Sequence, residues 1–171
     1  MTAPADSPAS LSPPAAERLF FTGNHELVLD AKWRLTIPSK FRAGLVPNEK
    51  SRRVMVAAHP QQSCLMVFSL HEWELFLRPL LSVRGADPTI SDWKEWLTSY
   101  SEEQELDQAG RVAISPGLRD PTGLHENRKV VFVGAGYRCQ VWDQRAYSEM
   151  MAARAARLRT SQPPDLGGFS L

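Results

Sequence analysis

The chain has 171 residues, of which 43% are hydrophobic and 23% are charged, and its formal net charge is +1. This length suits one domain or two small halves with a sizeable buried core, and the composition is ordinary for a soluble globular protein. No apolar run approaches the roughly 20 residues that a helix needs to cross a bilayer, so no membrane span is predicted, and the near-neutral charge neither favours nor excludes a nucleic-acid partner.

The N-terminal residues 1–18 are rich in Pro, Ala and Ser. They hold no basic stretch followed by an apolar stretch, which a secretory signal would need, so we expect a cytoplasmic protein. A segment of this composition cannot bury enough apolar surface to offset the loss of conformational entropy on ordering. We therefore predict that residues 1–18 form a disordered tail.

The first strand is predicted within residues 20–29, and it leads into a polar turn at residues 30–34. The Asp that begins this turn can accept hydrogen bonds from the backbone of its own turn. Beyond the turn, Leu35 and Ile37 alternate with polar residues, which is typical of a strand with one buried face. A proline follows, and because it has no backbone N–H it suits the start of a short helix, predicted over residues 39–45.

Two apolar, β-branched runs at residues 53–58 and 63–69 are separated by a polar turn, and they predict a pair of strands. Apolar residues then recur at spacings of three and four over residues 70–83, which predicts a helix that Pro79 should kink or split. A second helix is predicted over residues 91–99. Four tryptophans in these helices and in a later strand are expected to pack in the core or in a subunit interface, namely Trp73, Trp93, Trp96 and Trp142.

Residues 106–119 repeat residues 29–42 without a gap, so an internal duplication is the central feature of the sequence. The aligned charged residues are Asp30 with Asp107, Arg34 with Arg111 and Arg42 with Arg119. The last arginine of each copy follows an apolar residue in the short helix. We expect Arg42 and Arg119 to bond a carbonyl or carboxylate in a structural role.

One position of the turn differs between the copies, with Trp33 in the first and Gly110 in the second. If this position needs a positive φ, tryptophan is costly there, whereas glycine is not. We therefore expect the first turn either to adopt another backbone geometry or to expose Trp33 to solvent.

The second copy is followed by another predicted hairpin, with strands at residues 129–133 and 138–142 around a glycine-containing loop. Asp143 can then cap a helix that runs to about Arg157 and is rich in Ala, Met and Arg. Each half of the chain thus has the same order of elements: turn motif, short helix, hairpin and helix.

This order divides the chain into two halves and two tails. The first half is predicted at residues 19–100 and the second at residues 101–158. A flexible C-terminal tail is expected at residues 159–171, which hold a Pro-Pro and a Gly-Gly pair.

The motif pair resembles the MraZ family of bacterial regulators, which have an AbrB-like swapped-hairpin fold. The residues that carry the resemblance are Asp30, Arg34, Ile37, Pro38, Phe41 and Arg42 in the first half and Asp107, Gly110, Arg111, Ile114, Leu118 and Arg119 in the second. The resemblance implies an α+β fold, in which two pseudo-symmetric AbrB-like swapped-hairpin halves form a small β-barrel with flanking helices.

The resemblance also implies a function, that of a sequence-specific DNA-binding transcriptional regulator of a division and cell-wall gene cluster. Its partners would be double-stranded DNA, bound at short direct repeats in a promoter, and further copies of the chain in a homo-oligomeric ring. No cofactor, metal, membrane or small-molecule substrate is implied. In this family the arginine of the motif contacts DNA, so the candidate DNA-binding residues are Arg34, Arg111 and, assisting them, Lys32. The candidate turn-organising residues are Asp30, Asp107 and Gly110.

The residues themselves leave two roles open for Arg34 and Arg111. Each can pair with the Asp four residues earlier in its own turn, or reach a DNA phosphate or a guanine edge, for which arginine is the commonest bidentate partner. Both can hold, because the Asp would orient the Arg. Residues 30–42 carry one Asp against four basic residues, whereas residues 107–119 carry one Asp against two Arg. We expect the first half to dominate any basic surface.

Other functions stay open at this stage. Trp33 and the near-neutral charge would suit an oligomeric interaction scaffold that has lost DNA binding, and the fold would suit an antitoxin-like AbrB regulator encoded beside a toxin. An enzyme is the least supported, because no phosphate-binding glycine loop, serine elbow or zinc motif appears. Cys64 and Cys139 lie in corresponding predicted strands, and we expect buried small hydrophobic side chains rather than a disulfide or metal ligands.

Overall fold

The computed structural model describes residues 19–47, 51–85, 87–124 and 128–162. The predicted disordered tail at residues 1–18 lies outside the described residues, as does residue 163 onward of the predicted C-terminal tail. The last helix, α5, spans Gln144–Thr160 and so includes the first residues of that predicted tail.

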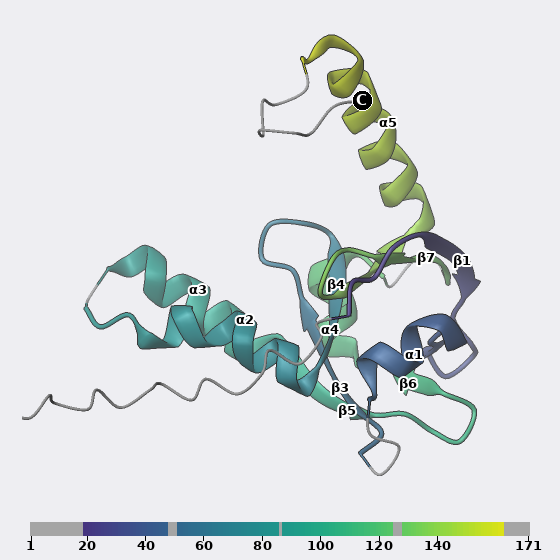
Figure 1. The fold of residues 1–171 in the computed structure, drawn as a ribbon, viewed down its shortest axis with the longest axis horizontal. Coiled ribbons are helices and arrows are strands. Elements are labelled where there is room, and N and C mark those ends of the chain that lie inside the picture. Colours follow the sequence, from purple (N-terminus) through teal and green to yellow (C-terminus); the bar gives the residue numbers. More distant parts are fainter. Residues whose placement is uncertain (1–18, 48–50, 86, 125–127, 163–171) are drawn as a thin grey trace, which may run out of the picture.

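The described part of the chain forms a mixed α+β fold, as predicted. Its strands are β1 (Asn24–Val28), β2 (Arg34–Thr36), β3 (Arg53–Ala58), β4 (Cys64–Ser69), β5 (Ser101–Glu105), β6 (Arg111–Ala113), β7 (Lys129–Gly134) and β8 (Cys139–Asp143). Six of them form one antiparallel sheet in the order β1-β7-β8-β4-β3-β5, and β2 pairs with β6 in a separate ladder. Figure 1 shows β1 beside β7 and β3 beside β5. The described strands form no closed barrel, so the predicted small β-barrel is wrong. Strands β2 and β6 have three residues each, and among the described strands they pair with one another rather than bridging the sheet edges.

The two halves of the chain exchange their first strands. Strand β1 of the first half pairs with β7 of the second, and β5 of the second half pairs with β3 of the first. Strands β4 and β8 meet in the middle of the sheet. The expected hairpin arms meet at their turns, where Asp30 N donates to Arg34 O at 3.1 Å and Asp107 N donates to Arg111 O at 2.9 Å. The halves are thus interlocked, while the AbrB-like swapped-hairpin assignment stays a prediction.

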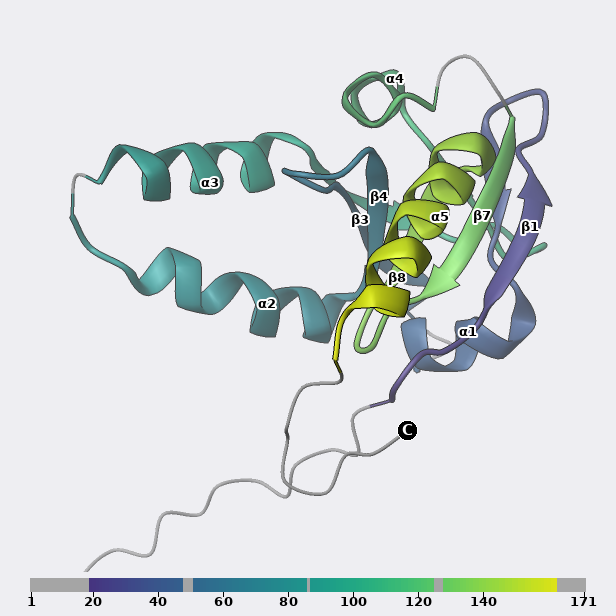
Figure 2. The same cartoon turned by 90° about the horizontal axis from the view of Figure 1, so that it is seen from above.

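The helices are α1 (Ser39–Leu45), α2 (Leu70–Ser82), α3 (Pro88–Ser99), α4 (Pro116–Arg119) and α5, with a 3₁₀ turn over Asp120–Thr122. Helices α2 and α3 extend together from the β3–β4 part of the sheet, and α5 runs beside β7 and β8 (Figure 2). Pro79 lies inside α2 without splitting it. Helix α3 begins earlier than predicted because Asp87 caps it, with Oδ1 accepting from Thr89 N at 2.8 Å, and because a proline suits its first position. Asp143 caps α5 as predicted.

The main core lies between the sheet and the two motif copies. It contains Leu35, Ile37 and Phe41 from the first copy and Val112, Ile114 and Leu118 from the second. Because both copies contribute to one cluster, this core belongs to the two halves jointly. Successive side chains of β4 alternate between faces of the sheet, so Met66 and Phe68 pack on the opposite face, with Trp73 of α2 and Leu97 of α3.

The packing predicted for the tryptophans and cysteines is confirmed. Trp73 and Trp142 are buried, and Trp93 and Trp96 pack against the smaller cluster. The two cysteines are free and buried, and burial raises the pKa of each thiol to about 12. Both thiols stay protonated at neutral pH and act as small hydrophobic groups.

Candidate nucleic-acid interface

The two copies of the motif fold into the same tight turn. In each, one side-chain oxygen of the leading Asp accepts hydrogen bonds from the backbone N–H groups two and four residues further on. These bonds measure 2.8 and 3.0 Å for Asp30 and 2.9 and 3.0 Å for Asp107. The predicted turn-organising aspartates therefore lie where a carboxylate can order the backbone.

The residue before each arginine has the left-handed backbone conformation. The φ angle is 75° at Gly110 and 58° at Trp33, the one non-glycine residue with a positive φ in the described part of the chain. The expectation that tryptophan gives the first turn another geometry is wrong. Trp33 is also half-buried rather than fully exposed, because its ring packs against the main core. This packing offsets the steric cost of a positive φ at a bulky residue.

The ladder of β2 and β6 brings the two turns side by side. Leu35 pairs with Val112 at its centre, and both are buried. Neighbouring residues of a strand point to opposite faces, so Arg34 and Arg111 lie together on the outer face of the ladder. Spacing in the sequence could not reveal this juxtaposition, since it depends on pairing between the halves.

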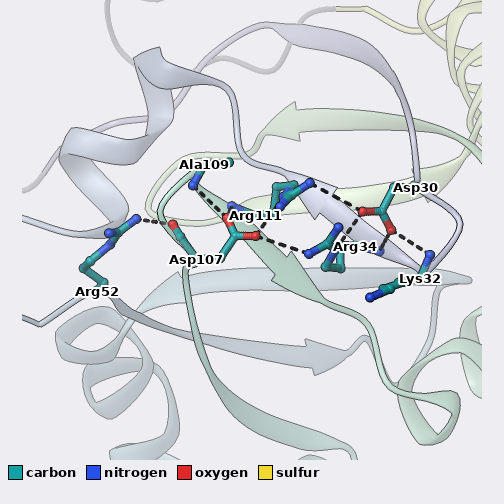
Figure 3. Close-up of polar contacts among 7 residues, drawn as sticks. All are labelled: Asp30, Lys32, Arg34, Arg52, Asp107, Ala109 and Arg111. Atoms are coloured by element: carbon teal, nitrogen blue, oxygen red, sulfur yellow. Dashed lines mark hydrogen bonds and ion pairs between the residues drawn. The ribbon is translucent and has the colours of Figure 1, made fainter.

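The two turns join in one ion-pair cluster, formed by Asp30, Arg34, Asp107 and Arg111 (Figure 3). Within each turn, the arginine Nε donates to the aspartate Oδ2, at 2.6 Å in the first and 2.8 Å in the second. Across the turns, Arg34 Nη1 lies 3.5 Å from Asp107 Oδ2, and Arg111 Nη1 lies 3.7 Å from Asp30 Oδ2. We call these four side chains the Arg–Asp cluster.

The Arg–Asp cluster is accessible to solvent. About a third of each arginine side chain is exposed, 31% for Arg34 and 32% for Arg111. Hydrogen bonds from the backbone N–H of Arg34 are the largest cause that lowers the pKa of Asp30, and those from Arg111 do the same for Asp107. Both carboxylates therefore stay charged at neutral pH, and the formal charges of the cluster cancel. The cluster can present oriented N–H donors, but its attraction for a polyanion has to come from its neighbours.

Lys32 is one such neighbour, with a side chain that is exposed at the tip of the first turn. Its backbone N–H belongs to the turn, and its amine joins none of the contacts drawn in Figure 3. The predicted structural role of Arg42 is confirmed, because its Nε donates to the carbonyl of Ile37 at 2.9 Å. Arg119 behaves differently, since its guanidinium stacks over the ring of Trp33 with Cζ 4.3 Å from the ring centroid.

Two further arginines border the turns and were not among the predicted site residues. Arg52 donates from Nη2 to the carbonyl of Asp107, and Arg128 lies over Trp33 at 5.2 Å. Both directly precede a strand of the second hairpin in their own half. A comparison of the two halves beyond the motif itself would have exposed this shared position.

The described residues contain no group of three or more His, Cys, Asp or Glu side chains suited to a metal ion. None of the helices in the described ranges is both long and apolar enough to cross a membrane. The Arg–Asp cluster therefore stands out as the polar arrangement that the duplication builds.

Two interlocked repeats that each present an Arg–Asp turn define a class of duplicated α+β proteins. The chain matches the family model described as "MraZ protein, putative antitoxin-like" over residues 20–89 and 98–165, one segment in each half. It belongs to the MraZ family.

Curated relatives agree with this assignment over nearly their whole length. The chain is 33% identical over 151 residues to "Transcriptional regulator MraZ" of Thiobacillus denitrificans, which covers 88% of this chain and 99% of the relative. The protein of the same name from Aromatoleum aromaticum is also 33% identical with the same coverage. That of Shewanella sp. strain MR-7 is 31% identical over 154 residues, again 88% and 99% of the two chains. The family is thus one of transcriptional regulators by name.

Proposed function

We propose that this protein is a sequence-specific, DNA-binding transcriptional regulator that contacts double-stranded DNA through Arg34 and Arg111. The observation that carries the proposal is the Arg–Asp cluster, which holds two arginine side chains, each about a third exposed, side by side on the outer face of the β2–β6 ladder. Asp30 and Asp107 orient the arginines, so the structural and the DNA-binding roles are combined.

The orientation of each arginine supports base reading. Each Nε is engaged by the aspartate of its own turn, while the Nη2 groups take part in none of the contacts that form the cluster. A guanidinium held in this way can offer its Nη2 N–H donors to the O6 or N7 atom of guanine. Lys32, exposed on the first turn, would add a phosphate contact that positions the protein without reading sequence.

A single pair of turns offers few DNA contacts, so affinity requires repetition. We propose that the chain assembles into a homo-oligomeric ring, which would bind short direct repeats in the promoter of a division and cell-wall gene cluster through avidity. Exposed apolar side chains on α2 and directly after it, including Phe76, Leu81 and Val83, are candidates for contacts between copies. In this proposal the protein acts in the cytoplasm at the nucleoid, without a cofactor and without enzymatic activity.

The test replaces Arg34 and Arg111 with Ala, separately and together, and measures binding to a labelled duplex from the region upstream of its own gene. Each single variant is expected to bind about tenfold more weakly or worse, and the double variant to lose specific binding. Light scattering should show unchanged oligomer size. Arg145→Ala is a matched control, because Arg145 makes the same kind of i,i+4 pair, Nε to Glu149 at 2.8 Å, but on α5. Unchanged affinity in the double variant would refute the site.

An interaction scaffold without DNA binding is the second candidate. The observation that favours it is the closure of the Arg–Asp cluster on itself, since both arginines already have carboxylate partners. A scaffold would show no salt-sensitive binding to the upstream duplex, whereas a regulator that contacts phosphates would lose affinity steeply as salt rises.

A further inference from the structure

We propose that Trp33, Arg119 and Arg128 form an additional phosphate-binding site beside the first turn, which the second turn lacks. We call these three residues the Trp33 cluster. The inference rests on the proposed DNA-binding function. It adds that the two halves are not equivalent, because one half of each chain would bind the DNA backbone more strongly than the other.

The two turns have equivalent arginine neighbours. Arg42 and Arg119 end the two motif copies and lie beside the turn of the opposite half, as shown by Arg42 near Gly110 and by Arg119 over Trp33. Arg52 and Arg128 form the second equivalent pair. The carbonyl of Arg52 accepts from Leu106 N at 2.7 Å, and that of Arg128 accepts from Leu29 N at 2.8 Å.

At the glycine turn, both arginines are engaged by the backbone. Arg42 Nε donates to the carbonyl of Ile37, and Arg52 Nη2 donates to the carbonyl of Asp107. The guanidinium of Arg42 lies so close to Gly110 that a Cβ there would be 2.8 Å from its Cζ. The absence of a side chain at Gly110 therefore makes room for the arginine to lie against the turn.

At the tryptophan turn, the indole ring fills that room and the arginines stack on it. The distances from Cζ to the ring centroid are 4.3 Å for Arg119 and 5.2 Å for Arg128. Arg119 Nε is buried and has no hydrogen-bond partner among the residues that the structure describes. Stacking engages the face of a guanidinium and not its in-plane N–H groups. Arg128 is exposed and can donate to phosphate oxygens, and Arg119 can do so from its Nη1 and Nη2 end.

The charge around the Trp33 cluster favours an anion. Arg119 and Arg128 come close to the first turn, next to the exposed Lys32, while the carboxylate of Asp30 is already engaged in the Arg–Asp cluster. Asp120 follows Arg119 in the chain, and its exposed carboxylate partly offsets this positive charge. Trp33 is held half-buried against the main core, so it supports the arginines and does not insert between bases. The ligand class is the phosphodiester backbone.

The test is a salt titration of binding to the same upstream duplex, with log K plotted against log of salt concentration. The slope should become less steep by about 1 for each arginine removed in each engaged copy of the chain, so by about 2 per copy in Arg119→Gln/Arg128→Gln. The matched control is Arg42→Gln/Arg52→Gln at the equivalent positions, for which the slope should not change. Trp33→Gly gives the first turn the residue of the second turn. It should make the slope less steep, as Arg119→Gln/Arg128→Gln does.

The outcomes separate this inference from the proposed function. An unchanged slope in Arg119→Gln/Arg128→Gln, with binding still abolished by loss of Arg34 and Arg111, overturns the Trp33 cluster and leaves the regulator. Equal slope changes in both double variants also overturn it, because the two turns would then be equivalent. If the double variant fails to fold, Arg128→Glu at its exposed position should still weaken binding at least tenfold, and unchanged affinity there counts against the site. Absence of salt-sensitive binding by the unaltered protein refutes the proposed function itself.

Discussion

The two halves of the chain agree closely on one side of the sheet and differ on the other. On the side of the turns, each buried motif residue has a counterpart of similar size, such as Leu35 with Val112 and Ile37 with Ile114. On the other side, the first half carries α2 and α3 over a small core, whereas the second carries α5, which has no buried residue. The same duplication has thus been retained in one layer and lost in the other.

Strand exchange explains this difference. A motif residue packs in a core shared by both halves, so a change in one half disturbs the other. The helices that follow the hairpins are not exchanged, and each packs against strands of its own half. In the first half, for example, Trp73 of α2 packs on Phe68 of β4 with 5.4 Å between ring centroids. The shared layer is therefore constrained to stay symmetric, while the outer layer is free to diverge.

Truncating equivalent core residues should have the largest effect on stability, and it tests whether the two halves share one core. Ile37→Ala and Ile114→Ala remove side chains that are 0% and 3% exposed. Each should lower the free energy of unfolding by about 3 kcal/mol, because a buried cavity is left in the same core. Denaturant unfolding followed by circular dichroism, at one fixed protein concentration, should give a single transition for both variants. Two separate transitions, with only one moved by each substitution, would show that the halves have independent cores.

The two halves also differ at one residue next to the exchanged strands, where the second half has Gly134 and the first has Ala58. Gly134 N donates to the carbonyl of Gly23 at 2.8 Å, and Ala58 N donates to the carbonyl of Tyr100 at 2.8 Å at the equivalent position of the first half. The first half thus accepts a methyl group at a site where the second has none. A Cβ on Gly134 would lie 2.5 Å from Thr22 N and 2.6 Å from the carbonyl carbon of Phe21, and backbone cannot move aside cheaply.

Gly134→Ala should therefore lower the free energy of unfolding by about 2 kcal/mol, measured by thermal or denaturant melting. Gly117→Ala is the control, because a Cβ there would meet only the Ser115 hydroxyl at 3.9 Å, an ordinary contact. It should be neutral or slightly stabilising, since alanine is the better helix former. Equal stability of the two variants would show that the close backbone approach at Gly134 does not constrain the second half.

Much of the fold was predictable from local pattern because its signals are local. Alternating apolar residues and a proline placed β2 and α1, and the predicted helix over Ser39–Leu45 has the observed bounds. Strand partners were not predictable in this way. The hydrogen bonds of a ladder join backbone N–H and C=O groups, which are the same in every strand and do not specify which strands pair. The predicted barrel was wrong for the same reason. At α3, the helix was predicted from residue 91, whereas Asp87 is its cap and the helix begins at Pro88.

The candidate site shows the same limit. The duplication identified all four members of the Arg–Asp cluster, and the pairing within each turn followed from the i,i+4 spacing. The cross pairs between Arg34 and Asp107 and between Arg111 and Asp30 depend on the ladder, so no local pattern contained them. The conformation of Trp33 was also beyond sequence rules, because a positive φ at tryptophan is tolerated only through its packing on the core and under two arginines.

The pH dependence of the Arg–Asp cluster should change the stability of the protein least. The pKa of Asp30 and that of Asp107 are lowered from the ordinary value of 3.8, chiefly by backbone hydrogen bonds. A carboxylate with a lowered pKa in the folded state contributes stability above its unfolded pKa, and this contribution is lost as the pH falls below 3.8 through the folded value. Both groups are solvent-accessible and screened, so the shift in melting temperature should be no more than a few degrees.

Asp30→Asn/Asp107→Asn isolates this contribution, because an asparagine oxygen can still accept the backbone bonds of the turn while the charge is removed. The double variant should melt below the unaltered protein at pH 7, and the gap should narrow as the pH is lowered from 5 to below 3.8. Each single variant should give about half of that gap if the two turns contribute equally. A larger effect of Asp107→Asn would instead show that Arg52, which donates to the Asp107 carbonyl, makes the glycine turn the more strongly ordered one. A gap that stays constant across this pH range would refute the charge-based stabilisation, since asparagine does not titrate and the aspartates do.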